Sequence, residues 1–483
     1  MKTIFEKSQE GQKAFSLPKD EKVFQTYTPA KNLVRESSLP LPEIAEIDLT
    51  RHFAGLASRN RGIDNWFYPL GSCTMKLNPR VNEEAARLEG FSRTHPWAPD
   101  RFVQGNLEMM DHLLILLNDI CGMEGGTLAP HAGAQGEFVG AAMIAAYHRD
   151  RKDFQRVEMI VPDNAHGTNP ATAAMGGYQI RSIATNVKGD IDIEALRQLV
   201  SEKTAGLMLT NPNTLGLFSP VILEVAKIVH EAGGLLYYDG ANLNPMLNVA
   251  RPGDMGFDVL HLNLHKTFST PHGGGGPGAG PVLCKKKLIP YLPVPHVKRD
   301  ENGWKRIFHD EKSIGRIATF HGNFGIYLRA YLYIILHGHY GLRRIAENCV
   351  LNANYLKDKI GKYFKVPFER PCMHEFVVQA DRYLDRGVRA YDIAKRMLDY
   401  GVHAPTVYFP LIIKECFLIE PTETESKATL DRFIEIVEMI VAEIEKDPKI
   451  VKEAPHNQTV RRLDEVLAAR NPVLITKTLL SRD

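Results

Sequence analysis

The run Val259-Leu260-His261-Leu262-Asn263-Leu264-His265-Lys266-Thr267 leads from an apolar stretch to a lysine, and the glycine-rich run Gly273-Gly274-Gly275-Gly276 follows. A lysine in this setting is poorly explained as a solvated surface charge. When a lysine is desolvated, its neutral amine can add to an aldehyde. Lys266 is therefore a candidate for covalent attachment of an aldehyde cofactor, although the residue taken alone leaves a structural role equally open.

Short apolar runs alternate with amphipathic helical stretches on the N-terminal side of this lysine. Strands are predicted at residues 157–161, 206–209 and 235–238, and helices at 107–120, 136–148, 193–200 and 221–232. This alternation predicts an α/β domain with a mainly parallel sheet. Ligands of such sheets bind outside the carboxyl ends of the strands, so the residues just after the apolar runs are candidates for function.

The chain is predicted to consist of an arm and two domains. Residues 1–85 are mixed and Pro-rich, which is typical of an arm that wraps around something such as a partner subunit. Residues 86–325 form the predicted large domain, and residues 326–483 the smaller C-terminal α/β domain. The elements expected in this second domain are a long helical region at 325–362, a strand at 375–378, and helices at 391–400 and 428–445.

The composition indicates an ordinary globular protein. Of 483 residues, 44% are hydrophobic and 24% charged, which is ample for two domains with a large core. The net charge of +2 favours neither nucleic acid nor a membrane surface as the main partner. Six dispersed cysteines without a Cys-x-x-Cys pair favour reduced thiols over a disulfide or zinc site. Without an apolar signal core or a bilayer-spanning stretch, a cytoplasmic protein is expected.

Two polar residues follow predicted strands. Asp239, in Asp239-Gly240-Ala241-Asn242, comes directly after the strand at 235–238. A carboxylate there could pair with a protonated pyridine nitrogen, although a turn or a helix cap is the common role of an isolated Asp-Gly. His166 follows the strand at 157–161 and could stack on a planar ring. A lone histidine is nevertheless more often structural.

The run Ala132-Gly133-Ala134-Gln135-Gly136 opens a predicted helix. Small residues let a backbone approach an anion, and the free N–H groups and helix dipole favour a phosphate; tight packing explains the run equally well. Pyridoxal 5′-phosphate (PLP), a phosphorylated pyridine aldehyde, accounts for Lys266, Asp239, His166 and this run together.

Two other motifs lead to no assignment. The tetraglycine run lacks the Gly-Lys-Ser/Thr ending of a P-loop, so it is interpreted as a close backbone approach to a ligand or another subunit. His374-Glu375 does not continue into His-Glu-x-x-His, so a zinc protease is rejected, and no metal site is predicted.

Longer blocks resemble glycine dehydrogenase (decarboxylating), the P-protein of the glycine cleavage system. The resemblance extends from about residue 60 to 435. The chain resembles only the C-terminal half of the single-chain family members, as subunit 2 of the split form does. The matching blocks are residues 69–78, 133–137, 166–171, 239–242, 251–254, 261–268, 271–278, 403–406 and 419–423.

This resemblance implies the fold and a set of roles. The fold would be PLP-dependent transferase fold type I (aspartate aminotransferase-like), with a large mainly parallel-sheet domain and a smaller C-terminal α/β domain. Lys266 would be the Schiff-base lysine, Asp239 the partner of the ring nitrogen, and His166 the stacking residue. Further cofactor contacts are expected at Ala132, Gly133, Ala134, Gln135 and Ala241, and at the ring edge from Thr210 and Asn211.

The resemblance also implies an activity and partners. The reaction would be PLP-dependent decarboxylation of glycine, with transfer of the aminomethyl group to the lipoyl arm of the H-protein. A separate subunit 1 would replace the missing N-terminal half in an α2β2 heterotetramer. His265 is a candidate for proton transfer or lipoyl activation, because imidazole exchanges protons near neutral pH; passive packing remains open.

Two alternatives stay open at this point. Another PLP enzyme, such as an aldolase, a hydroxymethyltransferase or a simple amino-acid decarboxylase, would share the lysine and aspartate, and only the long blocks argue against it. The chain could also be an inert scaffold subunit, but the presence of both Lys266 and Asp239 argues against that role.

Overall fold

The computed structural model describes residues 2–15, 29–37, 39–272 and 278–474. The chain divides into two compact units. One unit contains Trp66–His456, and the other consists of Met1–Asn65 with Asn457–Asp483. The main helices of the second unit are α1 (Glu46–Ala57) and α14 (Glu465–Arg470).

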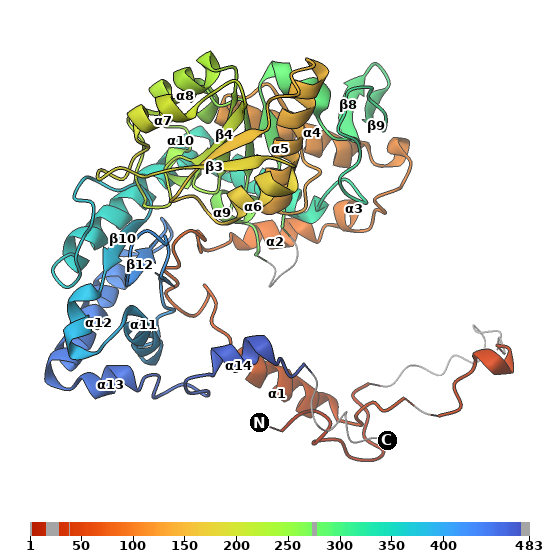
Figure 1. Cartoon of the computed structure of the whole chain (residues 1–483). Helices are drawn as coiled ribbons and strands as arrows, with labels where there is room; N and C mark the ends of the chain where they lie inside the picture. The colour runs from red at the N-terminus through yellow and green to blue at the C-terminus, as the bar shows by residue number, and fades with distance from the viewer. Residues whose placement is uncertain (1, 16–28, 38, 273–277, 475–483) are drawn as a thin grey trace. The chain divides into compact units, whose positions relative to one another are not determined.

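A seven-stranded sheet forms the centre of the unit Trp66–His456 in the described part of the chain (Figure 1). Its strand order is β1-β7-β6-β5-β4-β2-β3. The strands β3, β2, β4, β5 and β6 pair in parallel, while β7 is antiparallel to β6 and to β1. The predicted mainly parallel sheet is therefore confirmed. The strands are β1 (Gly125–Thr127), β2 (Glu158–Pro162), β3 (Gln179–Ile183), β4 (Thr204–Thr210), β5 (Leu235–Gly240), β6 (Val259–Leu262) and β7 (Val282–Cys284).

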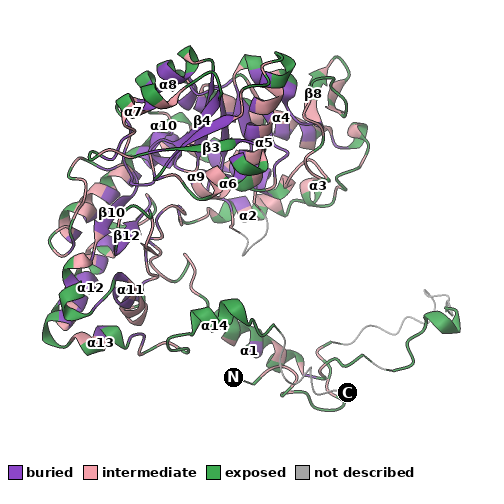
Figure 2. Cartoon of the chain, viewed as in Figure 1, coloured by how far each residue is buried: buried purple, intermediate pink, exposed green. Residues whose placement is uncertain are grey.

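The central strands are apolar on both faces because helices cover both faces. In β5, Leu236 and Tyr238 belong to the apolar layer that contains α4 (Gln104–Cys121) and α8 (Ile222–Glu231). Their neighbours Leu235 and Tyr237 belong to the opposite layer. Successive side chains of a strand point to opposite faces, so a strand covered on both sides is a continuous apolar run. Figure 2 shows these central strands as buried.

Helix α5 (Gly133–Asp150) packs on the sheet face that carries Leu235 and Tyr237. It lies close to the strands because many of its residues are glycine or alanine, which have small side chains. A Cβ placed on Gly140 would lie 2.3 Å from the Tyr237 ring, so only glycine permits the observed distance. This close packing brings the first turn of α5 to the carboxyl ends of the strands.

The C-terminal part of this unit has its own apolar core and a three-stranded antiparallel sheet, ordered β10-β12-β11 among the described residues. The long helix α10 leads into it and bends at Gly338, whose φ of 57° is not helical. The elements are α10 (Phe324–Ile360), β10 (Phe376–Gln379), α11 (Ala390–Asp399), β11 (Thr406–Val407), β12 (Cys416–Ile419) and α12 (Lys427–Lys446).

The predicted helices and strands are confirmed, with ends that differ by a few residues; α6 (Thr168–Met175) and α7 (Ile193–Leu199) complete the α/β alternation. The sequence did not predict β3, because this edge strand is largely exposed and polar. The antiparallel hairpin of β8 (His296–Asp300) and β9 (Gly303–Ile307) was missed as well.

Three further findings concern expectations from the sequence. All six cysteines are free thiols, as predicted. Within the residues that the structure describes, no helix combines the length and apolar character needed to cross a membrane. The tetraglycine run, interpreted as a close backbone approach, lies outside the described residues.

Candidate active site

A cavity of about 230 Å³ lies at the carboxyl ends of β4, β5 and β6. Thr210 ends β4, Asp239 lies near the end of β5, and Lys266 follows β6, so the topology gathers them there. This is the edge at which α/β sheets bind ligands. The other lining residues are Ser72, Gly133, Ala134, Glu137, His166, Thr168, Thr214, Ala241, Asn242, His261, Asn263 and His265.

Lys266 belongs to α9 (Leu264–Thr267), a four-residue helix that directly follows β6. Its backbone N–H donates to the carbonyl of Asn263 at 3.0 Å. The side chain is half-buried, and its amine has no hydrogen-bond or ion-pair partner among the described residues. An amine without a competing partner in a cavity is available for covalent chemistry.

Asp239 is only 2% exposed and still carries its negative charge. Burial raises its pKa, but His261, a hydrogen bond from Asn169 and the Lys266 ammonium together outweigh burial and hold the pKa below its ordinary value. Asn169 Nδ2 donates to Oδ2 at 3.0 Å, and the backbone N–H of Ala241 donates to Oδ1 at 3.0 Å. An ionised carboxylate at this position suits a protonated ring nitrogen.

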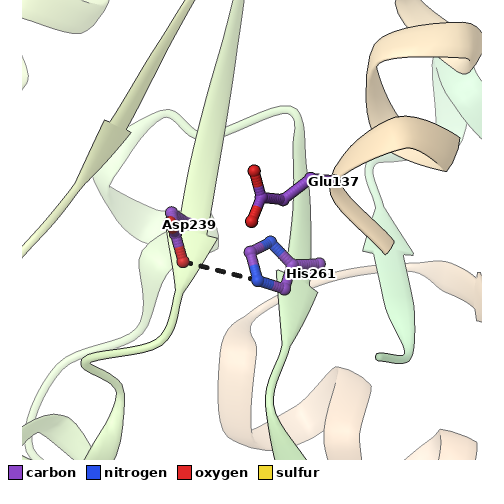
Figure 3. A group of neighbouring side chains, drawn as sticks. All are labelled: Glu137, Asp239 and His261. Carbon is purple, nitrogen blue, oxygen red and sulfur yellow. Dashed lines mark ion pairs between the residues drawn. The ribbon is translucent and has the colours of Figure 1, made fainter. Parts of the chain in front are cut away.

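Glu137 of α5 and His261 of β6 point toward Asp239 (Figure 3). Burial and the adjacent Asp239 carboxylate raise the pKa of Glu137 above its ordinary value, because both make a negative charge on Glu137 less favourable. His261 Nε2 lies 3.4 Å from Asp239 Oδ1 and 2.9 Å from Asn263 Oδ1. Because both neighbours are acceptors, Nε2 carries a ring proton, and Nδ1 lies 2.7 Å from the Tyr237 hydroxyl, with which it shares a hydrogen bond.

The first turn of α5 fits a phosphate. The first N–H groups of an α-helix have no intrahelical partner, and those of this 18-residue helix begin at Gly133, with Gly133 and Ala134 at the cavity. A Cβ on Gly133 would lie 2.1 Å from Asn263 Nδ2, so only glycine lets the helix start this close to the loop before Lys266.

The structure separates the other two predicted members of this cradle from the cavity lining. Ala132 is the N-cap residue. The Gln135 side chain donates to the carbonyl of Ile317 at 2.9 Å and accepts from the N–H of His131 at 2.7 Å. Gln135 therefore contributes at most its backbone N–H to the predicted phosphate site.

The predicted ring-edge residues differ in their placement. The Thr210 hydroxyl is buried at the cavity and has no hydrogen-bond partner among the described residues, which is the condition expected of a group that binds a ligand oxygen. Ala241 also lines the cavity. Asn211 is fully buried behind it, and its Oδ1 accepts from the N–H of Ser219 at 3.0 Å.

Two histidines border the cavity. His166 is exposed, and its Nδ1 lies 2.8 Å from Thr168 Oγ1, which holds the ring at the cavity wall. Burial, with the positive charge of Lys266, lowers the pKa of His265 to about 3. His265 is therefore a neutral ring at pH 7, and its buried Nδ1 has no hydrogen-bond partner among the described residues. Its role in proton transfer or lipoyl activation stays a prediction.

Ser72 lines the cavity although its segment was predicted to be part of an arm. Its N–H donates to Glu375 Oε2 at 2.6 Å, and Asn242 Nδ2 donates to Glu375 Oε1 at 3.3 Å. Ser72 and Glu375 were each noticed in the sequence, Ser72 in a resemblance block and Glu375 in a rejected zinc motif. Their separation along the chain hid the contact.

Comparisons with known proteins identify the relatives of this chain. A family model described as glycine dehydrogenase, C-terminal domain, matches residues 345–462, and one described as aminotransferase class-V matches residues 142–293. A protein of Caldanaerobacter subterraneus subsp. tengcongensis, named "Probable glycine dehydrogenase (decarboxylating) subunit 2", is 53% identical over 474 residues, covering 98% of each chain. A Bacillus cereus protein of the same name is 53% identical over 478 residues, covering 98% of this chain and 96% of its own.

Solved structures show the same fold. The inhibitor-bound glycine decarboxylase (P-protein) of the glycine cleavage system matches with a TM-score of 0.71 at 19% identity, covering 85% of this chain and 93% of that chain. Glutamate decarboxylase of Lactobacillus brevis matches with a TM-score of 0.66 at 13% identity, covering 86% and 96%.

The sheet topology, the aminotransferase match and the Lys266–Asp239 cavity define a PLP-dependent enzyme of fold type I. At 53% identity over almost its whole length, the chain belongs to the family of glycine dehydrogenase (decarboxylating) subunit 2.

Proposed function

We propose that this chain decarboxylates glycine with PLP and transfers the aminomethyl group to the lipoyl arm of an H-protein. The observation that carries the proposal is one cavity, in a member of this family, that contains a buried, charged aspartate and a lysine whose amine has no partner among the described residues. When bound, PLP supplies an aldehyde for covalent attachment and a ring that accepts the electrons left by departing CO2.

Different residues of the chain have different roles in this proposal. Lys266 provides the attaching amine, and Asp239, held by Asn169, stays ionised against the ring nitrogen. The start of α5 binds the phosphate through backbone N–H groups, including those of Gly133 and Ala134. His166 stacks on the ring.

Three further residues have a role in this proposal. The Thr210 hydroxyl, which has no hydrogen-bond partner in the described part of the chain, would contact the ring edge. Asn211 acts from behind the cavity by holding the loop after β4, and His265 packs as a neutral imidazole beside the reacting atoms.

The partners belong to the same proposal. The relatives are named as subunit 2, which supports a companion subunit 1 that supplies the other half of a split P-protein. We propose an α2β2 heterotetramer with glycine as substrate and the lipoylated H-protein as acceptor. The division into an arm (1–85), a large domain (86–325) and a small domain (326–483), and the cytoplasmic location, stay predictions.

The test is an assay of the full chain co-purified with its companion subunit. Release of ¹⁴CO2 from labelled glycine is measured with lipoylated and with unlipoylated H-protein. Release that requires the lipoyl group supports the proposal, whereas equal release without it indicates a simple decarboxylase. Lys266→Ala is expected to abolish both the visible absorbance of bound PLP and the release, and Lys188→Ala, an exposed lysine, serves as its control.

A further inference from the structure

Residues 72–78, here called the strap, run between the large sheet and the C-terminal part of the unit Trp66–His456. Ser72, Thr74 and Lys76, which are alternate residues of the strap, each donate to a glutamate. The contacts are Ser72 N to Glu375 at 2.6 Å, Thr74 N and Oγ1 to Glu420 at 2.9 and 2.6 Å, and Lys76 Nζ to Glu423 at 2.8 Å.

Lys76 is the most constrained residue of the strap. It is 4% exposed, its ammonium donates to Asn244 Oδ1 at 2.8 Å besides Glu423, and the Tyr333 hydroxyl lies 3.1 Å from the ammonium. Burial lowers the pKa of Lys76, but Glu423 and Tyr333 outweigh this effect and raise it above its ordinary value, so the side chain is an ammonium.

A fourth contact of Lys76 is with α9, the helix that carries Lys266. Its ammonium donates at 2.7 Å to the carbonyl of Thr267, the last residue of α9. Carbonyls at a helix C-terminus lack intrahelical donors, and a cation there is favourable. The strap holds the next turn as well, because Ser269 Oγ donates to the carbonyl of Leu77 at 2.9 Å.

The amine of Lys266 has no partner of its own among the described residues, so its position depends on the backbone that carries it. That backbone is a single helical turn whose last carbonyl is bound by Lys76. Catalytic groups must be held to within a fraction of an ångström, and small misplacements reduce the rate strongly.

We propose that Lys76, charge-compensated by Glu423, is a positioning residue that fixes α9 and thereby the amine of Lys266. The proposal rests on the assignment of Lys266 as the cofactor lysine. The strap thus does more than join two parts of the fold, since it determines where the reactive amine stands.

The alternative is that the Lys76–Glu423 ion pair only stabilises the fold and does not position α9. Three variants distinguish these two roles. Lys76→Met leaves Glu423 buried without a counter-charge, so both roles predict a lower unfolding temperature. The double variant Lys76→Met/Glu423→Gln removes both charges and is expected to regain much of this stability. Its Thr267 carbonyl still lacks the ammonium donor. Arg396→Met, which breaks the ion pair with Glu443 on another helix, is the control for loss of an ion pair.

The readouts are the unfolding temperature, the rate at which visible absorbance appears when PLP is added to the cofactor-free full chain, and kcat and KM for glycine with the companion subunit. In the double variant we expect roughly a 10- to 100-fold loss in both the attachment rate and kcat, with KM changed by less than about threefold. The control is expected to lower the unfolding temperature and to leave both rates as in the unmodified chain.

Recovery of attachment rate and kcat together with stability in the double variant would overturn the proposal, because a structural pair alone explains that result. The attachment rate needs no glycine turnover. If the unmodified chain attaches PLP at Lys266 but does not decarboxylate glycine, the proposed function fails, and the positioning role is still decided by the attachment rates.

Discussion

Asp239 keeps its charge in a place where burial alone would remove it. The charge is maintained by neighbours from three elements: Asn169 on α6, His261 on β6 and Lys266 on α9. An ionised carboxylate that is almost completely buried requires such partners, and sites of this kind cluster where chemistry occurs.

Replacing the charge while keeping the shape tests this role. Asp239→Asn retains an oxygen that accepts from Asn169 but no longer stabilises a positive ring nitrogen. We expect PLP still to bind and kcat for glycine to fall by roughly two to three orders of magnitude, as when other preorganised electrostatic groups are removed. Asp254→Asn, in an exposed pair with Arg251, is the matched control. Turnover close to normal in Asp239→Asn would assign the ring nitrogen to another group.

Glu420 predicts a pH dependence of stability. Burial raises its pKa from 4.5 to about 7, despite two hydrogen bonds from Thr74. Because the folded state holds the proton more tightly than the unfolded state, this stabilisation is fully present below pH 4.5 and is lost as the pH rises through about 7.

Glu420→Gln tests this pH dependence. Between these pH values its free energy of unfolding, measured by urea denaturation, should fall less than that of the unmodified chain. Glu202→Gln, at an exposed site, should keep the slope of the unmodified chain. If the free energy of unfolding changed with pH equally in the unmodified chain and in both variants, Glu420 would not be the group responsible.

At the scale of elements, α5 shows how packing and binding share residues. Its small side chains were noticed in the sequence, where tight packing and phosphate binding explained them equally well. In the structure the two explanations apply to different positions: Gly140 packs against Tyr237, and Gly133 lies at the cavity beside Asn263.

Gly133→Ala tests the phosphate site at the start of α5. The added Cβ would meet Asn263 Nδ2 at 2.1 Å, so the helix start or Asn263 must move. We expect PLP to bind about tenfold more weakly, a loss of about 1.4 kcal/mol, in an absorbance titration. Gly90→Ala on α3 (Glu89–Ser92), where a Cβ would meet nothing within 4 Å, controls for the substitution itself. Unchanged affinity in Gly133→Ala would place the phosphate elsewhere.

At the scale of the molecule, the cavity is built from distant parts of one unit. Thr210 and Asp239 come from the large sheet, Ser72 from the strap, and Glu375, which holds Ser72, from the start of the C-terminal sheet. A ligand that binds this cavity therefore stabilises the folded unit as a whole.

Thermal unfolding measures this linkage. PLP at 100 times its dissociation constant should add about 2.7 kcal/mol to the free energy of unfolding, which raises the unfolding temperature by several degrees. At the same PLP concentration, Lys266→Ala should show a smaller increase, because the loss of covalent attachment raises its dissociation constant. An equal increase in both proteins would mean that attachment at Lys266 contributes nothing to the stability of the bound state.

Local pattern predicted much of the fold. The helices at 107–120 and 221–232 were predicted because each buries one apolar face, and the strand at 235–238 because it is apolar on both faces. Strand β3 was missed since an exposed edge strand lacks that signal. The strap was predicted as part of an arm because it has no periodic pattern, although Lys76 and Thr74 are buried.

The sequence by itself determined the α/β alternation, the lysine after β6 and the aspartate at the end of β5, because these depend on local apolar runs and on the residues that end them. Only the tertiary structure decided which residues surround that lysine. The contacts of Glu137 with Asp239, of Ser72 with Glu375 and of Lys76 with Thr267 join positions far apart in the chain. No local preference encodes such contacts; they arise when both faces of the sheet and the C-terminal core are buried together.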